Sequence, residues 1–362
     1  MPPRRTRLDR RCLDIGKSSL VQNQPTAILV KFIAFVAVVL SWVALLPNLR
    51  AGWPARVFAP YMYVGAGDDF KLTDCDDQCR QQFYTLAFII ARQDGYGKGA
   101  VYHQEPSWDG RIPLEQNFYH DQIDAIRQRG GDVIVSFGGE AGKELANVID
   151  DPARLEAAYQ KVIDQYKFTW LDFDIEGRNL DRGQSDSERR NTALAGLQKK
   201  NPGLTVSFTL PVDPEGLSQA SRSLLADAVK KGVKVHSANL MVMFFGKKFI
   251  NRGKPEGQLG VDSANAAYAQ LRKIDPAIQV GLCPCLGKNG SPDEVFTLHD
   301  AEILRTFADK TPWICSLHYW SINDDAAAPP KKRSVTGTHN VSVSNPPQPW
   351  AFARIFQTFT SH

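Results

Sequence analysis

The sequence predicts an α/β fold, a (β/α)8 TIM barrel that forms a single catalytic-type domain. The first observation is size: the chain has 362 residues, of which 43% are hydrophobic and 23% charged, so it can build a large core. The second is order, because eight apolar runs of strand type alternate with amphipathic stretches of helical period. Such alternation specifies parallel strands joined by crossover helices. Eight such units in about 300 residues fit this barrel.

The expected elements follow one another regularly. The strands are residues 57–64, 83–91, 132–137, 169–175, 204–210, 234–245, 278–286 and 314–322. Most are separated by amphipathic stretches with Gly or Pro near their ends, at residues 115–129, 152–166, 186–200, 219–231, 263–274 and 301–309. Residues 350–359 would form the closing outer helix. Residues 324–349, rich in Pro, Ser, Asn and Lys, would form a loop insertion after strand eight.

Residues 1–51 differ in character from the rest. They hold eight Lys or Arg against two Asp, and most of these cations precede the apolar run 32–46. The pattern is typical of a signal peptide, here cleaved after Ala51. The alternative is an uncleaved membrane anchor, because residues 27–30 and a snorkelling Lys31 extend the run to about 20 residues. Either way residues 52–362 are exported, secreted or periplasmic, and in the second case tethered.

The charge balance excludes some partners. The chain carries a net charge of +4, but its first 51 residues contribute +6, which leaves the remainder at −2. This argues against nucleic acid or an anionic surface as a partner and favours a neutral substrate. Membrane contact is expected only through the N-terminal segment if it stays uncleaved, and we expect a monomer.

The cysteines of the exported part predict no metal site. Their spacings match no common zinc motif, so neither metal nor cofactor is expected. Cys75 and Cys79 could close a local disulfide in an oxidising compartment, whereas Cys283 and Cys285 favour two packed core thiols.

Three carboxylates alternate along the fourth expected strand. Asp172, Asp174 and Glu176 share one face of this strand, because successive side chains point to opposite faces. Like charges this close repel, and burying them requires hydrogen bonds, a shared proton or a cation. This repulsion would raise the pKa of the last carboxyl group of the three, Glu176. A carboxyl group with a raised pKa suits protonation of a leaving group. In a barrel, the C-terminal strand end occupied by Glu176 is where catalytic residues belong.

Four ordered motifs resemble glycoside hydrolase family 18, the chitinases and endo-β-N-acetylglucosaminidases. They are SFGG at residues 136–139, the carboxylate run at 171–176, SFTLPV at 207–212 with EGL at 215–217, and HYWSIND at 318–324. The resemblance covers roughly residues 56–359. It implies an exported hydrolase that cleaves β-1,4-linked N-acetylglucosamine in chitin or chito-oligosaccharides by a substrate-assisted, retaining mechanism.

The resemblance also implies roles for individual residues. Glu176 would be the general acid and then the base that activates water. Asp174 would orient the acetamide and stabilise the oxazolinium, while Asp172 shares a proton with Asp174. Trp320 would form the floor of the sugar subsite next to the scissile bond.

Further candidates surround these residues. Tyr61 and Ser136 are assigned as supporting partners, and Met243 and Phe245 as substrate-binding residues on strand six. Simpler interpretations also exist: Asp172 could bond backbone groups, Trp320 could be core, the carboxylates could hold a hard cation, and Gly138-Gly139 could only permit a tight turn.

Two departures from the family pattern define an alternative function. Thr169 replaces the first Asp of the strand-four signature, and Trp170 replaces the usual Gly. On strand six, where the family typically has Asp and often Tyr, this chain has Phe244 and Phe245, which cannot bond the acetamide oxygen. The alternative is therefore a catalytically weak or inactive chitin- or glycan-binding protein on the same scaffold.

Overall fold

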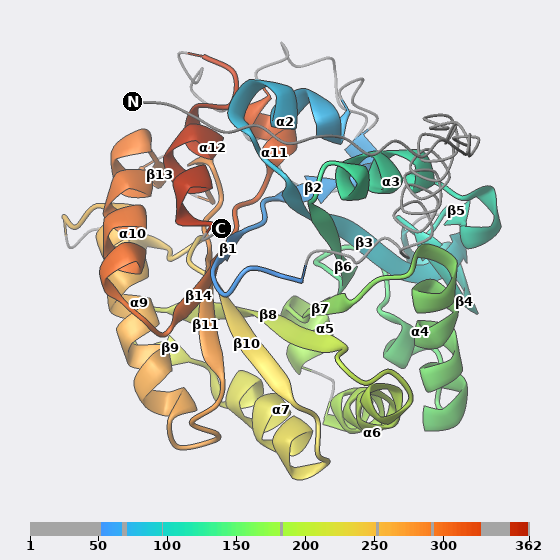
Figure 1. The fold of residues 1–362 in the computed structure, drawn as a ribbon. Helices are drawn as coiled ribbons and strands as arrows, with labels where there is room; N and C mark the ends of the chain where they lie inside the picture. Colours follow the sequence, from blue (N-terminus) through green and yellow to red (C-terminus); the bar gives the residue numbers. More distant parts are fainter. Residues whose placement is uncertain are drawn as a thin grey trace, which may run out of the picture. The chain divides into compact units, whose positions relative to one another are not determined.

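A closed ring of eight parallel strands forms the centre of the fold (Figure 1). The structure, a computed structural model, describes residues 52–66, 71–95, 97–181, 184–250, 253–290, 293–326 and 348–360. Ala51–His362 make one compact unit. The predicted export segment and most of the predicted loop insertion lie outside the described residues.

The strand order shows how the ring closes. β1 (Val57–Phe58) pairs with the last strand and β2 (Tyr61–Tyr63) with the second, so the two halves of the first expected strand join both edges of the sheet. The remaining barrel strands are β3 (Phe83–Asp94), β6 (Asp132–Gly138), β7 (Trp170–Asp174), β8 (Thr205–Asp213), β10 (Val235–Met241), β11 (Gln279–Cys283) and β14 (Ile314–Leu317). All neighbouring pairs among them are parallel, which confirms the predicted barrel.

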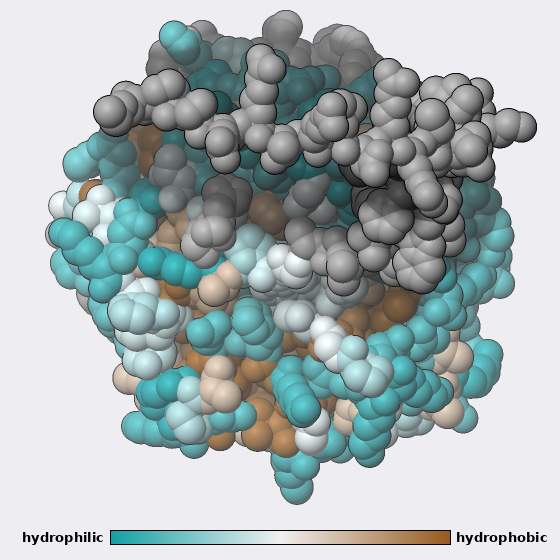
Figure 2. Space-filling model, in the orientation of Figure 1, coloured by the Kyte–Doolittle hydropathy of each residue, from teal (hydrophilic) through white to brown (hydrophobic). Residues whose placement is uncertain are grey.

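Helices surround the strands (Figure 1). They are α2 (Leu72–Cys79), α3 (His120–Gln128), α4 (Pro152–Tyr166), α6 (Gln184–Lys200), α7 (Gln219–Lys230), α9 (Glu256–Leu271), α10 (Leu298–Lys310) and α12 (Ala351–Phe356), with short helices α5 (Gly177–Asp181), α8 (Lys247–Ile250) and α11 (Ile322–Asp325). Their starts follow from local chemistry: Asp151 caps α4 ahead of Pro152, and Thr297 and Asp300 form a capping box at α10. Hydrophilic side chains dominate the periphery of the described surface in this view (Figure 2).

Several elements differ from the sequence prediction. β10 and β14 end at Met241 and Leu317, before the predicted ends at 245 and 322. β3 continues beyond the barrel and pairs with the antiparallel β4 (Val101–Trp108), which in turn pairs with β5 (Ile112–Pro113). α9 begins at Glu256, seven residues before the predicted start at 263, because Gly257 and Gly260 weaken the helical pattern. A β-carbon at Gly257 would lie 2.6 Å from the Asp300 carbonyl oxygen, so this glycine permits close packing of α9 on α10.

The core has three parts. The main core fills the space between the outer faces of the strands and the helices. Inside the barrel, the floor cluster comprises Val57, Ala59, Phe83, Ile134 and Trp170, with Trp53 packed against it. The mouth cluster comprises Tyr61, Ala87, Met243, Cys283 and Cys285, with Phe88, Met241 and Trp320 packed against it. No helix within the described part of the chain is long and apolar enough to cross a membrane.

Candidate active site

β7 carries the carboxylates into the barrel. All five of its residues are buried, and their side chains alternate between the two sides of the strand. Leu171 and Phe173 pack into the main core, whereas Trp170 belongs to the floor cluster. Asp172 and Asp174 therefore stand in layers above the floor, and Glu176 follows at the open end of the strand.

Asp172 is fully buried and surrounded by donors. Its Oδ2 accepts hydrogen bonds from Tyr61 Oη at 2.7 Å and Ser136 Oγ at 2.8 Å. Its Oδ1 accepts from Ser207 Oγ at 2.7 Å and Asn239 Nδ2 at 3.3 Å, and Thr209 Oγ1 lies 3.0 Å from both oxygens. Burial raises the pKa of Asp172, and these bonds oppose that rise. The partners are side chains from four other strands, so this carboxylate ties the barrel interior together.

Asp174 lies in a different environment. It is 4% exposed, and its Oδ1 has no hydrogen-bond partner among the described residues. Burial raises the pKa of Asp174 well above its usual value, and the neighbouring carboxylates of Glu176 and Asp172 raise it further. A buried oxygen without a hydrogen-bond partner lowers the stability of the folded state unless a bound group donates a hydrogen bond to it.

Glu176 is half-buried at the strand end. Burial raises its pKa to about 7, with the Glu140 carboxylate as the second cause. A carboxyl group with this pKa is partly protonated at neutral pH, which is the state a general acid needs. Gly177 follows with φ 49° and begins α5, so the chain turns away from the mouth immediately after Glu176.

The structure places four of the candidate residues, Tyr61, Ser136, Met243 and Trp320, around these carboxylates. Tyr61 and Ser136 reach them as donors to Asp172, and Met243 and Trp320 through the mouth cluster. Trp320 is half-buried and stacks on Phe88, with ring centroids 5.5 Å apart and planes at 15°. Its ring combines apolar support on one side with partial exposure, as a sugar platform requires.

Phe245 does not follow the other strand-six residues into the mouth. Strict alternation from Asn239 would point it there, but Phe244 adopts a left-handed φ of 53° and breaks the alternation. Phe245 consequently packs into the main core, while its backbone N–H donates to Glu294. Phe244 itself is 40% exposed. Of the two substrate-binding candidates on strand six, only Met243 shares the cluster that contains Trp320.

The two changes in the strand-four signature lie at the opposite end of the strand. Trp170 packs edge-on against Trp53 in the floor cluster, with ring centroids 5.0 Å apart, and donates to Ser207 Oγ at 3.0 Å. Thr169 Oγ1 accepts a 3.0 Å bond from the Trp53 indole N–H. The large indole in place of the family's glycine therefore fills the barrel floor.

Sequence reasoning missed several residues of the site. Thr209, Asn239, Phe88 and the buried thiol of Cys283 were not assigned to it. Ser207 and Thr209 alternate along β8 in the same way as the carboxylates alternate along β7. This alternation of polar residues could have identified Thr209 as an inward-facing residue of the site.

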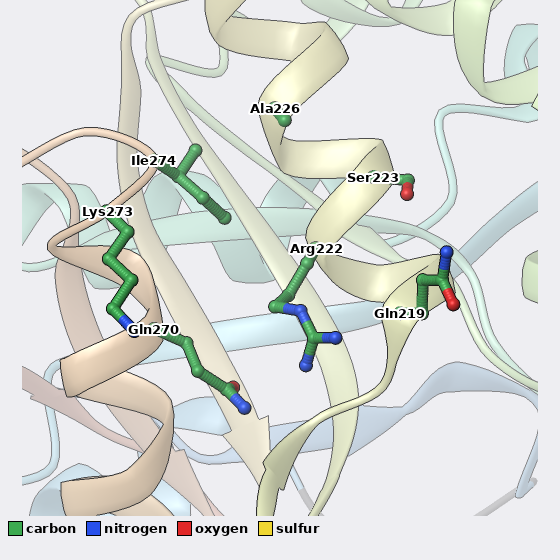
Figure 3. A pocket seen from close by; sticks show the side chains of 7 residues that line it. All are labelled: Gln219, Arg222, Ser223, Ala226, Gln270, Lys273 and Ile274. Carbon is green, nitrogen blue, oxygen red and sulfur yellow. The ribbon is translucent and has the colours of Figure 1, made fainter.

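A hollow lies on the outside of the barrel, away from the carboxylates. It is a groove of about 560 Å³ between α7 and α9, to which Arg222, Gln270 and Lys273 contribute (Figure 3). Arg222 donates to the Leu217 carbonyl, and Gln270 accepts from the Leu217 N–H. These bonds hold β9 (Gly216–Leu217) in place, so both polar groups have structural partners. Among the described residues, no group of three or more His, Cys, Asp or Glu side chains is placed to hold a metal ion.

Comparisons with known proteins agree with this geometry. No protein-family model matches the chain. The catalytic domain of the hyperthermophilic chitinase from Pyrococcus furiosus is 31% identical with a TM-score of 0.71, and the match covers 86% of this chain and 97% of that one. The catalytic domain of a family GH18 chitinase from the fern Peteris ryukyuensis, 15% identical with a TM-score of 0.52 over 84% of this chain and 100% of that one, shares the fold.

Two curated proteins are also similar. A probable bifunctional chitinase/lysozyme of Escherichia coli (strain K12) is 29% identical over 333 residues, which are 86% of this chain and 35% of that protein. Endochitinase 11 of Metarhizium anisopliae is 29% identical over 302 residues, which are 77% of this chain and 54% of that protein. The chain thus spans about a third and about half of their lengths. On its barrel, its carboxylate strand and these similarities, the chain belongs to glycoside hydrolase family 18, the chitinase family.

Proposed function

We propose that this protein hydrolyses β-1,4-linked N-acetylglucosamine in chitin or chito-oligosaccharides, with the substrate's own acetamide as nucleophile. The observation that carries the proposal is the buried Oδ1 of Asp174, which has no hydrogen-bond partner among the described residues and lies two residues before Glu176, at the end of β7. The acetamide N–H of the substrate would donate a hydrogen bond to this oxygen. Substrate-assisted hydrolysis needs one acid and one charge stabiliser, and no second nucleophilic carboxylate.

Each residue then has a defined part in the mechanism. Glu176 donates its proton to the glycosidic oxygen as the bond breaks, and afterwards accepts a proton from the attacking water. Asp174 accepts a hydrogen bond from the acetamide N–H, which turns the acetamide oxygen toward the anomeric carbon and stabilises the positive oxazolinium. Trp320 packs against the sugar ring. The chitinase from Pyrococcus furiosus supports the substrate class, because catalytic-site mutants of one of its domains are known in complex with chito-oligosaccharides.

Export is part of the proposal. The basic residues before the apolar run 32–46 are typical of a signal peptide or an N-terminal anchor. We expect the protein outside the cytoplasm, with its N-terminus starting at Gly52 if the segment is cleaved. Cell fractionation with N-terminal sequencing tests this, and an intact Met1 in the cytoplasmic fraction would contradict it.

The decisive experiment compares the full chain with its Glu176→Gln variant on an N-acetylchito-oligosaccharide. The wild type is expected to release shorter oligomers, and the variant to bind the sugar but lose at least about 100-fold in rate, because glutamine cannot donate the proton. A wild type that binds the oligomer without releasing product would disprove the hydrolase.

Phe244 supports the second candidate function, a weak or inactive chitin-binding protein. It offers an exposed aromatic ring at the rim where the family typically has a carboxylate. Asp and Asn tolerate its left-handed backbone conformation better than Phe does. We predict that Phe244→Asp raises the hydrolysis rate, whereas Phe244→Asn, matched for backbone preference, raises it less. Equal rates for all three proteins would show that the rim carboxylate is not the missing contact.

A further inference from the structure

We infer that Glu140 is a positioning residue of this site: the turn after β6 brings it to the end of β7, where its carboxylate adds to burial in favouring the protonated form of Glu176. The inference rests on the proposed function, in which Glu176 is the general acid. Glu140 is exposed and follows the SFGG motif, and sequence reasoning gave it no role.

Two glycines place Glu140 at the end of β7. Gly138 pairs in register with Asp174, and the Gly139 N–H donates to the Asp174 carbonyl oxygen at 2.9 Å. Both glycines have left-handed φ values, 101° and 85°. A β-carbon at Gly138 would lie 2.2 Å from that carbonyl oxygen, and one at Gly139 would lie 2.7 Å from the Phe88 ring. Only glycine lets the chain pass this closely over β7, and Glu140 is the first side chain after the turn.

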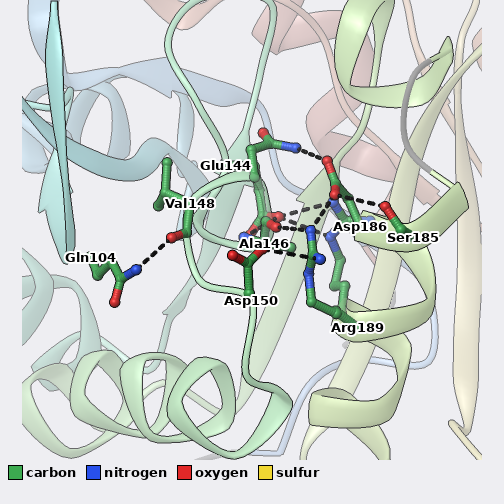
Figure 4. A network of polar contacts seen from close by, with 10 residues as sticks. Gln104, Glu144, Ala146, Val148, Asp150, Ser185, Asp186 and Arg189 are labelled. Atoms are coloured by element: carbon green, nitrogen blue, oxygen red, sulfur yellow. Dashed lines mark hydrogen bonds and ion pairs between the residues drawn. The ribbon is translucent and has the colours of Figure 1, made fainter.

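The loop beyond Glu140 is firmly anchored. The fully buried Glu144 carboxylate accepts from Arg190 Nη2 at 2.9 Å and from Tyr159 Oη at 2.6 Å. Figure 4 shows the neighbouring contacts, in which Arg189 bonds the Ala146 carbonyl and pairs with Asp150. A loop held by a buried ion pair with α6 and a buried hydrogen bond from α4 has little freedom, so Glu140, which follows Gly139, stays near the end of β7.

Within the described part of the chain, the buried groups that surround the carboxylates do not bring the same charge as Glu140. Burial raises the pKa of Asp174 well above its usual value, with the Glu176 and Asp172 carboxylates as further causes, and this disfavours a negative charge on Asp174. Tyr61 on β2 and Cys283 on β11 face the carboxylates, and burial raises the pKa of both, so they stay neutral. The Asp172 carboxylate lies one layer deeper, among five hydrogen-bond donors. Glu140 is thus the exposed carboxylate whose charge acts directly on the acid.

A carboxyl titration tests this without requiring turnover. The full chain, with its glutamates labelled with carbon-13, is titrated by NMR, and the Glu176 signal is assigned by its absence in Glu176→Gln. We expect Glu140→Gln to move the Glu176 midpoint by about half a pH unit or more toward acid, because it removes a neighbouring negative charge. Glu140→Asp should keep most of the wild-type midpoint. Glu302→Gln, which removes an exposed carboxylate on the outer helix α10, should leave it unchanged.

The pH dependence of hydrolysis gives a second readout. The alkaline limb of kcat should move toward acid in Glu140→Gln by the same amount as the NMR midpoint. A Glu176 midpoint in Glu140→Gln equal to that of the wild type would overturn the inference. If the wild type hydrolyses nothing, the proposed function fails, but the titration still decides the role of Glu140.

Discussion

Asp172 and Asp174 lie two residues apart on one strand, and their surroundings give them different tasks. Five side-chain donors hold the oxygens of Asp172, whereas Oδ1 of Asp174 has no partner among the described residues. The sequence led us to expect a proton shared between the two. The hydrogen-bond donors around Asp172 favour this residue as the carboxylate that braces the barrel. The raised pKa of Asp174 favours Asp174 as the member of the pair that carries the proton.

This division predicts opposite effects for two matched substitutions. Asp172→Asn puts an amide N–H against the surrounding donors, and it should lower the free energy of unfolding by about 2–4 kcal/mol. Asp174→Asn should change stability by less than about 1 kcal/mol but lower the hydrolysis rate by about 100-fold. Urea denaturation and initial rates measure the two effects. Equal stabilities for the two variants would show that the donors around Asp172 do not hold it.

At the scale of the element, β7 begins with a residue that packs the barrel floor and ends with the candidate catalytic carboxylates. Its first inward residue, Trp170, fills the floor, and its last inward groups serve the mouth. We predict that Trp170→Gly, the family's usual residue, costs about 3–5 kcal/mol of unfolding free energy, because the cavity it leaves cannot collapse onto Trp53. Trp170→Phe keeps a smaller aromatic ring in the floor cluster and loses the bond to Ser207, which is worth about 1 kcal/mol, so it should cost less than Trp170→Gly. Thermal denaturation of both variants checks the order, and a Gly variant as stable as the Phe variant would contradict it.

The elements also show what a single sequence can and cannot predict. Short apolar runs between helical stretches predicted all eight barrel strands, because buried parallel strands read as apolar runs. Along each strand, successive side chains alternate between the two faces. The same alternation brought Tyr61, Ser136, Met243 and the carboxylates together. The sequence prediction was wrong at Phe245, because Phe244 adopts a left-handed conformation and redirects the following side chain. It was also wrong at the start of α9, because close packing requires glycines inside this helix. Both failures come from tertiary contacts that local pattern does not record.

At the scale of the whole molecule, stability should depend on pH through a buried carboxyl group outside the mouth. Glu256 is 5% exposed at the start of α9, where Asn289 donates to it at 3.0 Å. Burial, with the carboxylates of Glu294 and Asp300, raises its pKa to about 9. The folded state therefore holds a proton that the unfolded state releases above about pH 4.3, so this group's stability contribution is lost as pH rises from there to about 9.

Glu256→Gln tests this linkage, because glutamine mimics the protonated carboxyl group without titrating. The variant should resemble the wild type at pH 5 and be more stable by roughly 2 kcal/mol at pH 9. Chemical denaturation at pH 5, 7 and 9 measures the difference. A difference between the two proteins that does not grow with pH would mean that Glu256 is ionised in the folded state at all three values.

The central claim is that the substrate's acetamide attacks while Glu176 supplies the proton, and the anomer first released tests it most directly. Two displacements at the same carbon retain configuration. Proton NMR of a fresh digest of chitotetraose by the full chain should therefore show the β-anomer before mutarotation, and the Glu176→Gln variant should produce neither anomer at a comparable rate. An initial α-anomer, or a Glu176→Gln variant as active as the wild type, would contradict the account.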